Sequence, residues 1–210
     1  MQLDHVFIFV DQKASAILDL VSKGLAVSYR RDHVGQGTAN ACFVFDNAFL
    51  ELLYLTSETD ARLTPIERTK LWERSQWQAM HTCPYGIAWR GDDIGIATWP
   101  FMPPYLPQGV EIPVAIDSDD QNLPMMFTFP GSKAPKDWPD EKRRFPAHPG
   151  GWNSITQVEL ALPNWTLQSS AALKHMASCI KPPLIVTRGD KYAMMVTLGG
   201  PDGAKLTLSF

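Results

Sequence analysis

Glu51 is the residue of this chain whose setting most needs a chemical explanation. It lies inside an apolar run, with Phe and Leu directly before it and two Leu directly after it in residues 49–53. A carboxylate held in apolar surroundings is costly unless a partner neutralises it. Two kinds of chemistry suit such a residue: it ligates a metal ion, or it is oriented by a neighbour and removes a proton next to a carbonyl as a general base.

The segment that positions Glu51 is predicted to be a β-hairpin. Two apolar runs, 42–45 and 49–55, flank the turn sequence Asp46-Asn47-Ala48. An Asp-Asn pair tolerates the left-handed backbone that a tight turn often requires. Glu51 is therefore expected on the second strand of this hairpin.

The hairpin completes a larger unit with the elements that precede it. Hydrophobic spacing predicts a strand over 3–10, an amphipathic helix over 13–23 and a second strand over 25–31. Together with the hairpin, this order gives one βαβββ unit.

Two further units of this kind are predicted downstream. Residues 1–130 hold the first two units with a helical connector over 57–82, residues 131–154 form a long loop or gate, and residues 155–210 form the third unit. The second unit has strands near 85–90, 110–116 and 124–129 and a short helix reaching Trp99, and the third has a helix from Trp165 to Cys179 capped by Asn164. Because the third unit matches the first in order and length, an internal duplication is expected.

Composition narrows the classes of partner and the compartment. With 45% hydrophobic residues the chain can bury a real core, and a net charge of −3 gives no electrostatic footprint for nucleic acid or an anionic membrane surface. The three cysteines, Cys42, Cys83 and Cys179, lack metal-type spacing and favour a reducing compartment. The start of the sequence has no signal-peptide pattern and no apolar run is long enough to span a membrane, so the cytoplasm is expected.

The repeated units and two motifs resemble the vicinal oxygen chelate superfamily, and within it the glyoxalase-like domain proteins. The motifs are the opening Leu3-Asp4-His5-Val6 and the run from Gly37-Thr38 through Asn40 to residues 49–53. The resemblance implies an α+β fold of repeated βαβββ units that form concave half-barrel sheets, as in glyoxalase, bleomycin resistance and dioxygenase proteins. It also implies a small-molecule ligand in the concavity and, by analogy with other half-barrels, a homodimer.

The resemblance places His5 and Glu51 where the first unit of the family carries two metal ligands. In the second unit the matching positions are Gly86 and residues 125–127, which offer no donor, and in the third they are the weaker Gln157 and Thr207. A divalent metal (Zn, Mn, Fe, Ni or Mg) would then need a third donor from His148, His33 or Gln157. The equal alternative is no cofactor, with His5 and Glu51 hydrogen-bonded to each other inside the sheet.

Four further residues are candidates for substrate binding, each with a structural alternative. Arg90 ends a strand and suits a substrate carboxylate or an ion pair with Asp92 or Asp93. Asn40 is a pocket donor or a turn cap, and His148 lines the pocket mouth or lies exposed on the loop. Trp89 is an aromatic pocket wall or ordinary core.

Two functions remain open on this evidence. The first is a small-molecule lyase, isomerase or dioxygenase of the vicinal oxygen chelate type, with a degenerate metal site and with His5 and Glu51 at the reacting centre. The second is a metal-free protein that sequesters a small hydrophobic or aromatic compound. The retained His5 and Glu51 pair favours the enzyme, whereas the missing donors of the other units favour the binding protein.

Overall fold

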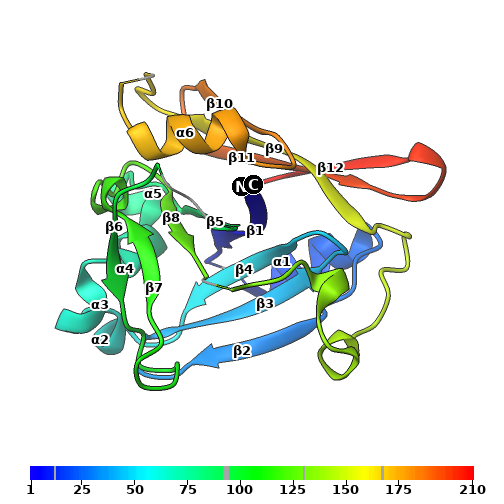
Figure 1. The fold of residues 1–210 in the computed structure, drawn as a ribbon, viewed down its shortest axis with the longest axis horizontal. Helices are drawn as coiled ribbons and strands as arrows, with labels where there is room; N and C mark the ends of the chain where they lie inside the picture. Colours follow the sequence, from blue (N-terminus) through cyan, green and yellow to red (C-terminus); the bar gives the residue numbers. More distant parts are fainter. Residues whose placement is uncertain (12, 92–94, 130, 167) are drawn as a thin grey trace.

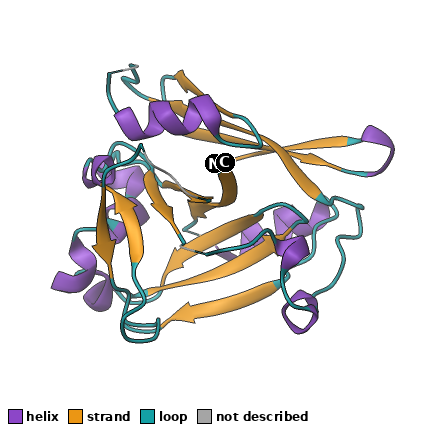
Figure 2. Ribbon diagram, viewed as in Figure 1, coloured by secondary structure: helices purple, strands orange, loops and turns teal. Residues whose placement is uncertain are grey.

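Two β-sheets form the framework of the computed structural model (Figure 1). The structure describes residues 1–210 except 12, 92–94, 130 and 167. One sheet has eight strands in the order β2-β3-β4-β1-β5-β8-β7-β6, and the other has four in the order β10-β9-β11-β12. The larger sheet is curved and open, and most helices lie at the periphery of the molecule (Figure 2).

The first βαβββ unit supplies half of the large sheet. Its elements are β1 (Gln2–Phe9), α1 (Lys13–Ser22), β2 (Tyr29–His33), β3 (Thr38–Val44) and β4 (Phe49–Leu55). The hairpin expected around Glu51 is β3 and β4, with Cys42 opposite Glu51, and β4 also pairs in parallel with β1 so that Glu51 lies opposite Phe7. The inner strand β1 is therefore next to the strand that carries Glu51.

The second unit repeats this pairing order on the other side of β1. Its strands are β5 (Tyr85–Arg90), β6 (Thr98–Phe101), β7 (Ile112–Ala115) and β8 (Met125–Thr128). As β1 does with β4, β5 pairs in parallel with β8, and an antiparallel β1–β5 pair joins the two units. The short helix predicted up to Trp99 is corrected in part: residues 92–94 lie outside the described residues, and Trp99 belongs to β6, opposite Val114.

A series of short helices connects the two units where a helical connector was predicted. They are α2 (Glu58–Ala61), α3 (Thr64–Glu67), α4 (Leu71–Ser75) and α5 (Trp77–Met80). After β8, the segment that precedes the third unit contains two 3₁₀ turns, η2 (Pro135–Asp137) and η3 (Asp140–Arg143); η1 (Ile116–Asp119) lies between β7 and β8.

The last part of the chain has the predicted order of elements but a different pairing from the first unit. Its elements are β9 (Ser154–Leu162), α6 (Ala171–Cys179), β10 (Leu184–Arg188), β11 (Ala193–Gly199), the 3₁₀ turn η4 (Pro201–Gly203) and β12 (Lys205–Ser209). Here the first strand, β9, pairs in parallel with β10 and antiparallel with β11, whereas β1 pairs in parallel with the last strand of its unit. The second unit, not the third, therefore shares the pairing pattern of the first.

The cap of α6 also differs from the expectation. The helix begins at Ala171 rather than near Trp165, and the side chain of Ser170 accepts a hydrogen bond from the Leu173 amide at 3.0 Å. Asn164, the predicted cap, has a φ of 60° and lies upstream of the helix. Ser is as good an N-cap as Asn, so composition alone did not separate the two positions.

The two faces of the large sheet are buried in two different cores. Val6 and Ile8 of β1 point into a core shared with β9, β11 and α6, while Phe7 and Phe9 point into a second core on the opposite face. This alternation follows from the period of two along a strand. His5 and Glu51 share the second face with Phe7, and so lie on the concave side.

The observed architecture confirms the predicted fold class: α+β with βαβββ units in a curved, open sheet. In the described part of the chain, no helix combines the length and apolar character needed to cross a membrane.

Candidate active site

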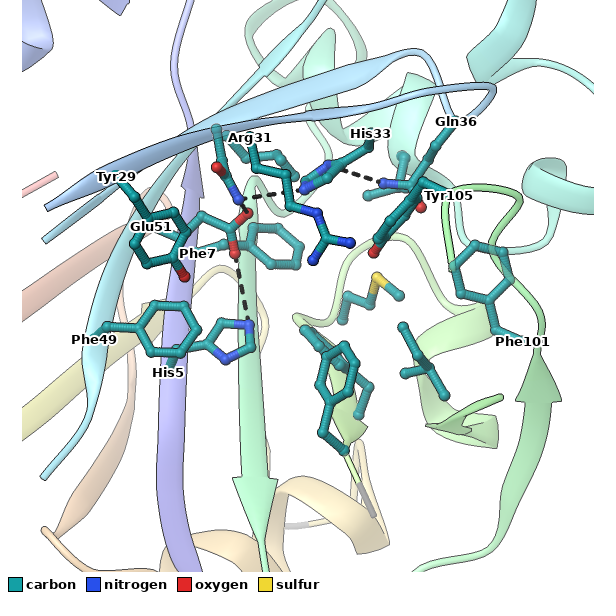
Figure 3. A pocket seen from close by; sticks show the side chains of 17 residues that line it. His5, Phe7, Tyr29, Arg31, His33, Gln36, Phe49, Glu51, Phe101 and Tyr105 are labelled. Atoms are coloured by element: carbon teal, nitrogen blue, oxygen red, sulfur yellow. Dashed lines mark hydrogen bonds and ion pairs between the residues drawn. The ribbon is translucent and has the colours of Figure 1, made fainter. Parts of the chain in front are cut away.

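A cavity on the concave face of the large sheet holds the side chains with chemical potential (Figure 3). Its volume is about 120 Å³, close to an engineered cavity of about 150 Å³ that binds benzene. The polar wall comes from β1 to β4 and the apolar wall from β5 to β8 and the segment before β7. The polar wall includes His5, Arg31, His33, Asn40 and Glu51, and the apolar wall includes Phe101, Ile112, Met125 and Phe127.

Glu51 has two differently employed carboxylate oxygens. Oε1 accepts a hydrogen bond of 2.7 Å from the side-chain amide of Asn40, and Oε2 lies 3.5 Å from Nε2 of His5. The residue is only 6% exposed. Asn40 therefore fixes the carboxylate, while Oε2 and His5 Nε2 face each other at a distance too long for a strong hydrogen bond. A reacting atom of a ligand can approach both groups from the cavity.

His5 is oriented from behind by Asp4. Nδ1 of His5 lies 2.7 Å from Oδ1 of Asp4, and the imidazole stacks on Phe49 with ring centroids 4.2 Å apart. An ionised carboxylate can only accept, so Nδ1 carries the hydrogen of this bond. Burial acts to raise the pKa of Asp4, but the hydrogen bond and charge of His5 outweigh it and the net pKa is lowered. Asp4 thus remains a carboxylate that holds the ring with Nε2 toward Glu51.

Arg90 supports Asp4 and does not line the cavity, which corrects its predicted placement. Its guanidinium lies 3.5 Å from Oδ2 of Asp4, donates to Gln2 at 3.2 Å and donates to the Asn47 carbonyl. These donors are committed to protein acceptors, so no fork is left for a substrate carboxylate. The alternative partners Asp92 and Asp93 lie outside the described residues.

A buried polar chain extends from Glu51 along the polar wall. The Asn40 amide that holds Glu51 also lies 3.2 Å from Nε2 of His33, and Nδ1 of His33 lies 2.9 Å from the Thr38 hydroxyl. The amide nitrogen is a donor, so Nε2 accepts and the hydrogen of His33 sits on Nδ1. Burial lowers the pKa of His33, which keeps this neutral form. Asn40 is therefore a positioning donor in the cavity rather than a turn cap.

Arg31 and Tyr105 complete the polar wall and were missed by the sequence analysis. The Arg31 guanidinium lies over the Tyr105 ring at 4.9 Å, and the other face of the aromatic wall continues to His33, whose ring centroid is 4.6 Å from that of Tyr105. The expected strand over 25–31 already contained the signal. Extended by one pair, its alternation places Tyr29, Arg31 and His33 on one face.

His148 and Trp89 lie outside the cavity, which corrects their predicted placement. His148 accepts from the Ala26 amide through Nδ1 and contacts the Val44 carbonyl through Nε2, each at 3.0 Å, so it fastens the loop to the first unit. Trp89 is 1% exposed and belongs to the core on the opposite face. The structural alternative therefore describes Trp89, whereas His148 is a buried clamp and neither a mouth residue nor an exposed one.

The donors around Glu51 do not fit the divalent metal that vicinal oxygen chelate proteins typically hold. Gly86 and Phe127 stand on β5 and β8 where the second unit would supply ligands, and neither side chain can donate to a metal. Gln157 bonds Glu159 in the small sheet instead. Within the part of the chain that the structure describes, no cluster of three or more His, Cys, Asp or Glu side chains could hold a metal ion. The chemistry of this site therefore has to be carried by its own side chains.

The paired units and the concave site between them define a vicinal oxygen chelate protein. The sequence profile of the family described as Glyoxalase-like domain matches residues 3–166. The chain belongs to this family, and the resemblance inferred from its motifs is confirmed.

Comparison with solved structures finds only distant matches. They include Streptomyces coelicolor methylmalonyl-CoA epimerase bound to 2-nitronate-propionyl-CoA (16% identity, 64% of this chain and 96% of that chain, TM-score 0.43). A hypothetical protein from Staphylococcus aureus matches with 13% identity over 98% of this chain and 84% of its own (TM-score 0.45). A mutant of Streptomyces coelicolor 4-hydroxymandelate synthase matches with 14% identity over 99% of this chain and 61% of its own (TM-score 0.43). No curated protein matches the chain significantly.

Proposed function

We propose that this protein is an acid–base enzyme that moves a proton at a carbon next to a carbonyl in a small substrate, as an isomerase or lyase would. Glu51 is the base and His5 is the acid. The observation that carries this proposal is the opposed pair Glu51 Oε2 and His5 Nε2, 3.5 Å apart at the edge of a largely apolar cavity.

The proton transfer balances with these two groups alone. Oε2 of Glu51 takes the proton, the electron pair of the C–H bond becomes the C=C bond of an enolate, and the carbonyl π pair moves onto oxygen. When the His5 ring is protonated, Nε2–H donates a hydrogen bond to that oxygen and stabilises its charge. Return of the proton to the same or another carbon regenerates Glu51 and gives the product.

The surrounding residues support this division of labour. Asn40 occupies Oε1, which leaves Oε2 as the oxygen that faces His5. Asp4 holds Nδ1 of His5 and favours the protonated ring on which the second step depends. Both reacting side chains are thus fixed by contacts outside the cavity, so little reorganisation is needed when a substrate enters.

Solvent deuterium exchange tests the proposal. The probes are phenylpyruvate and phenylacetone, which share a benzylic CH₂ next to a carbonyl, and incorporation of deuterium from D₂O is followed by NMR above the spontaneous rate. The wild type should accelerate exchange of at least one probe, and Glu51→Gln should lose about 100-fold or more of that acceleration. Glu58→Gln, an exposed carboxylate on α2, is the matched control and should exchange like the wild type.

Two outcomes would count against the enzyme. Equal exchange by the wild type and Glu51→Gln removes Glu51 from the chemistry. Tight binding of a probe by the wild type without any exchange would instead support the sequestering protein, to which the apolar wall of Phe101, Ile112 and Phe127 is suited. Metal analysis of the wild type beside His5→Ala belongs with this test, because metal bound only by the wild type would contradict a site that works through side chains alone.

A further inference from the structure

The geometry points to an anion subsite at Arg31 and Tyr105, so that the substrate of this site is a small carboxylate whose apolar body carries the reacting carbonyl. This inference rests on the proposed function of Glu51 and His5, because it defines which compounds are presented to them.

Arg31 is the available cation of the cavity. It lines the cavity wall, and Figure 3 shows its guanidinium projecting toward the interior, between Glu51 and Tyr105. Among the residues that the structure describes, no carboxylate lies within ion-pair distance of it. The other arginine near the site, Arg90, is committed to Asp4 and Gln2. An incoming anion therefore meets Arg31 without displacing a protein carboxylate.

Tyr105 holds this guanidinium in place. The cation lies 4.9 Å from the ring centroid, and the ring is itself stacked on His33 at 4.6 Å with an interplanar angle of 25°. A guanidinium over an aromatic face keeps its N–H edges free for a planar acceptor such as a carboxylate. Burial and the charge of Glu51 raise the pKa of Tyr105, so its hydroxyl keeps its hydrogen and can donate to the same anion.

The charge pattern along the cavity sets the orientation of such a substrate. The Glu51 carboxylate repels an anion at the inner end, although Asn40 and His5 partly neutralise it. Arg31 attracts the anion at the opposite end, where its side chain is exposed toward the mouth. A carboxylate at Arg31 directs the apolar body and carbonyl of the same molecule inward, toward Phe127 and the Glu51–His5 pair.

The neighbouring arginine provides a matched control. Arg30 precedes Arg31 on β2, is also exposed, and by strand alternation points away from the cavity that Tyr29, Arg31 and His33 line. Substituting it changes the net charge and the strand in the same way as substituting Arg31. Any difference between the two variants therefore reports the cavity position and not the charge of the whole molecule.

The test compares the affinities for phenylpyruvate and phenylacetone by titration calorimetry. These probes differ chiefly in a carboxylate that replaces a methyl group. The wild type should bind phenylpyruvate at least about tenfold more tightly, and Arg31→Gln should abolish this preference, since a partly exposed charge-assisted contact has about this worth. Arg30→Gln should keep the preference, and Tyr105→Phe, which keeps the ring and loses the hydroxyl, should reduce it less than Arg31→Gln.

Failure of this inference is distinct from failure of the proposed function. Absence of phenylpyruvate binding, no preference in the wild type, or an unchanged preference in Arg31→Gln overturns the anion subsite. Exchange lost in Glu51→Gln with the preference intact supports both proposals. A preference that depends on Arg31 in a wild-type protein that exchanges no deuterium keeps the subsite and removes the enzyme.

Discussion

Phe7 and Gly86 lie opposite each other in the β1–β5 pair, and the ring of Phe7 occupies the space that a side chain on Gly86 would need. A Cβ atom at position 86 would come within 2.0 Å of Cε1 of Phe7. Gly86 is the counterpart of His5 in the second unit. Steric exclusion by a core aromatic thus explains why this position cannot present a metal ligand to Glu51.

Gly86→Ala is expected to destabilise the fold because the new methyl group forces the Phe7 ring out of its position. Overpacking of this kind costs about 1–3 kcal/mol. Urea unfolding of the single variants and of Phe7→Ala/Gly86→Ala measures the coupling. In the Phe7→Ala background the alanine has room, so its additional cost should nearly vanish. Strictly additive effects would show that the two side-chain positions do not compete.

Asn47→Ala should loosen the contact between the hairpin and the last part of the chain. The Asn47 amide donates to the Ile155 carbonyl at 2.8 Å and accepts from the Ile155 amide at 2.9 Å, as a neighbouring strand would. Losing both bonds should cost about 1–3 kcal/mol. Hydrogen exchange of the Ile155 amide should accelerate, whereas Asn153→Ala, an exposed residue beside the same strand, should leave it protected. Unchanged protection in Asn47→Ala would remove this tie.

The role of Asn47 illustrates what the sequence could and could not predict. Local patterns were sufficient for the hairpin, for the strand that carries Glu51 and for the concave fold. Asn47 was expected to favour a left-handed turn, but it is absent from the non-glycine residues with positive φ in the described chain and its side chain instead makes contacts 108 residues away. Such contacts are tertiary and leave no periodic signal.

The candidate site follows the same division. His5, Asn40 and Glu51 were predicted from strand positions and the structure brings all three to one cavity. Arg90 and His148 were chosen for their chemistry, yet burial and long-range acceptors decide their roles. Tyr105 comes from an irregular, proline-rich segment, where no period indicates which side chains face inward.

Arg74→Met should be among the most destabilising single substitutions outside the site. Its buried guanidinium donates to the carbonyls of Cys83, Ser118 and Leu123 at 2.6–3.0 Å and so ties α4 to the second unit. Methionine fills similar volume but leaves these carbonyls unpaired, and each buried orphan costs about 1–3 kcal/mol. Arg62→Met, at an exposed ion pair, is the control and should cost less than about 1 kcal/mol. Equal unfolding free energies for the two variants would contradict the role of Arg74.

His33 should make both stability and proton transfer fall as the pH falls. Burial lowers its pKa in the folded state, so below the ordinary value of 6.5 the unfolded chain takes up a proton first and becomes favoured. This loss begins near pH 6.5 and continues down to the folded pKa; above it, both states are neutral and His33 contributes no slope. Protonation also places a hydrogen on Nε2, where the Asn40 amide needs an acceptor.

His33→Gln separates these effects, because a glutamine oxygen can still accept from Asn40 but does not titrate. Urea unfolding between pH 7.5 and 5.5 should show a shallower loss of stability in His33→Gln than in the wild type. His148 keeps part of the slope in both proteins, since burial lowers its pKa as well. If His33 acts on Glu51 through Asn40, the acid limb of deuterium exchange should shift to lower pH in His33→Gln. Parallel stability and exchange profiles in the two proteins would place the titrating group elsewhere.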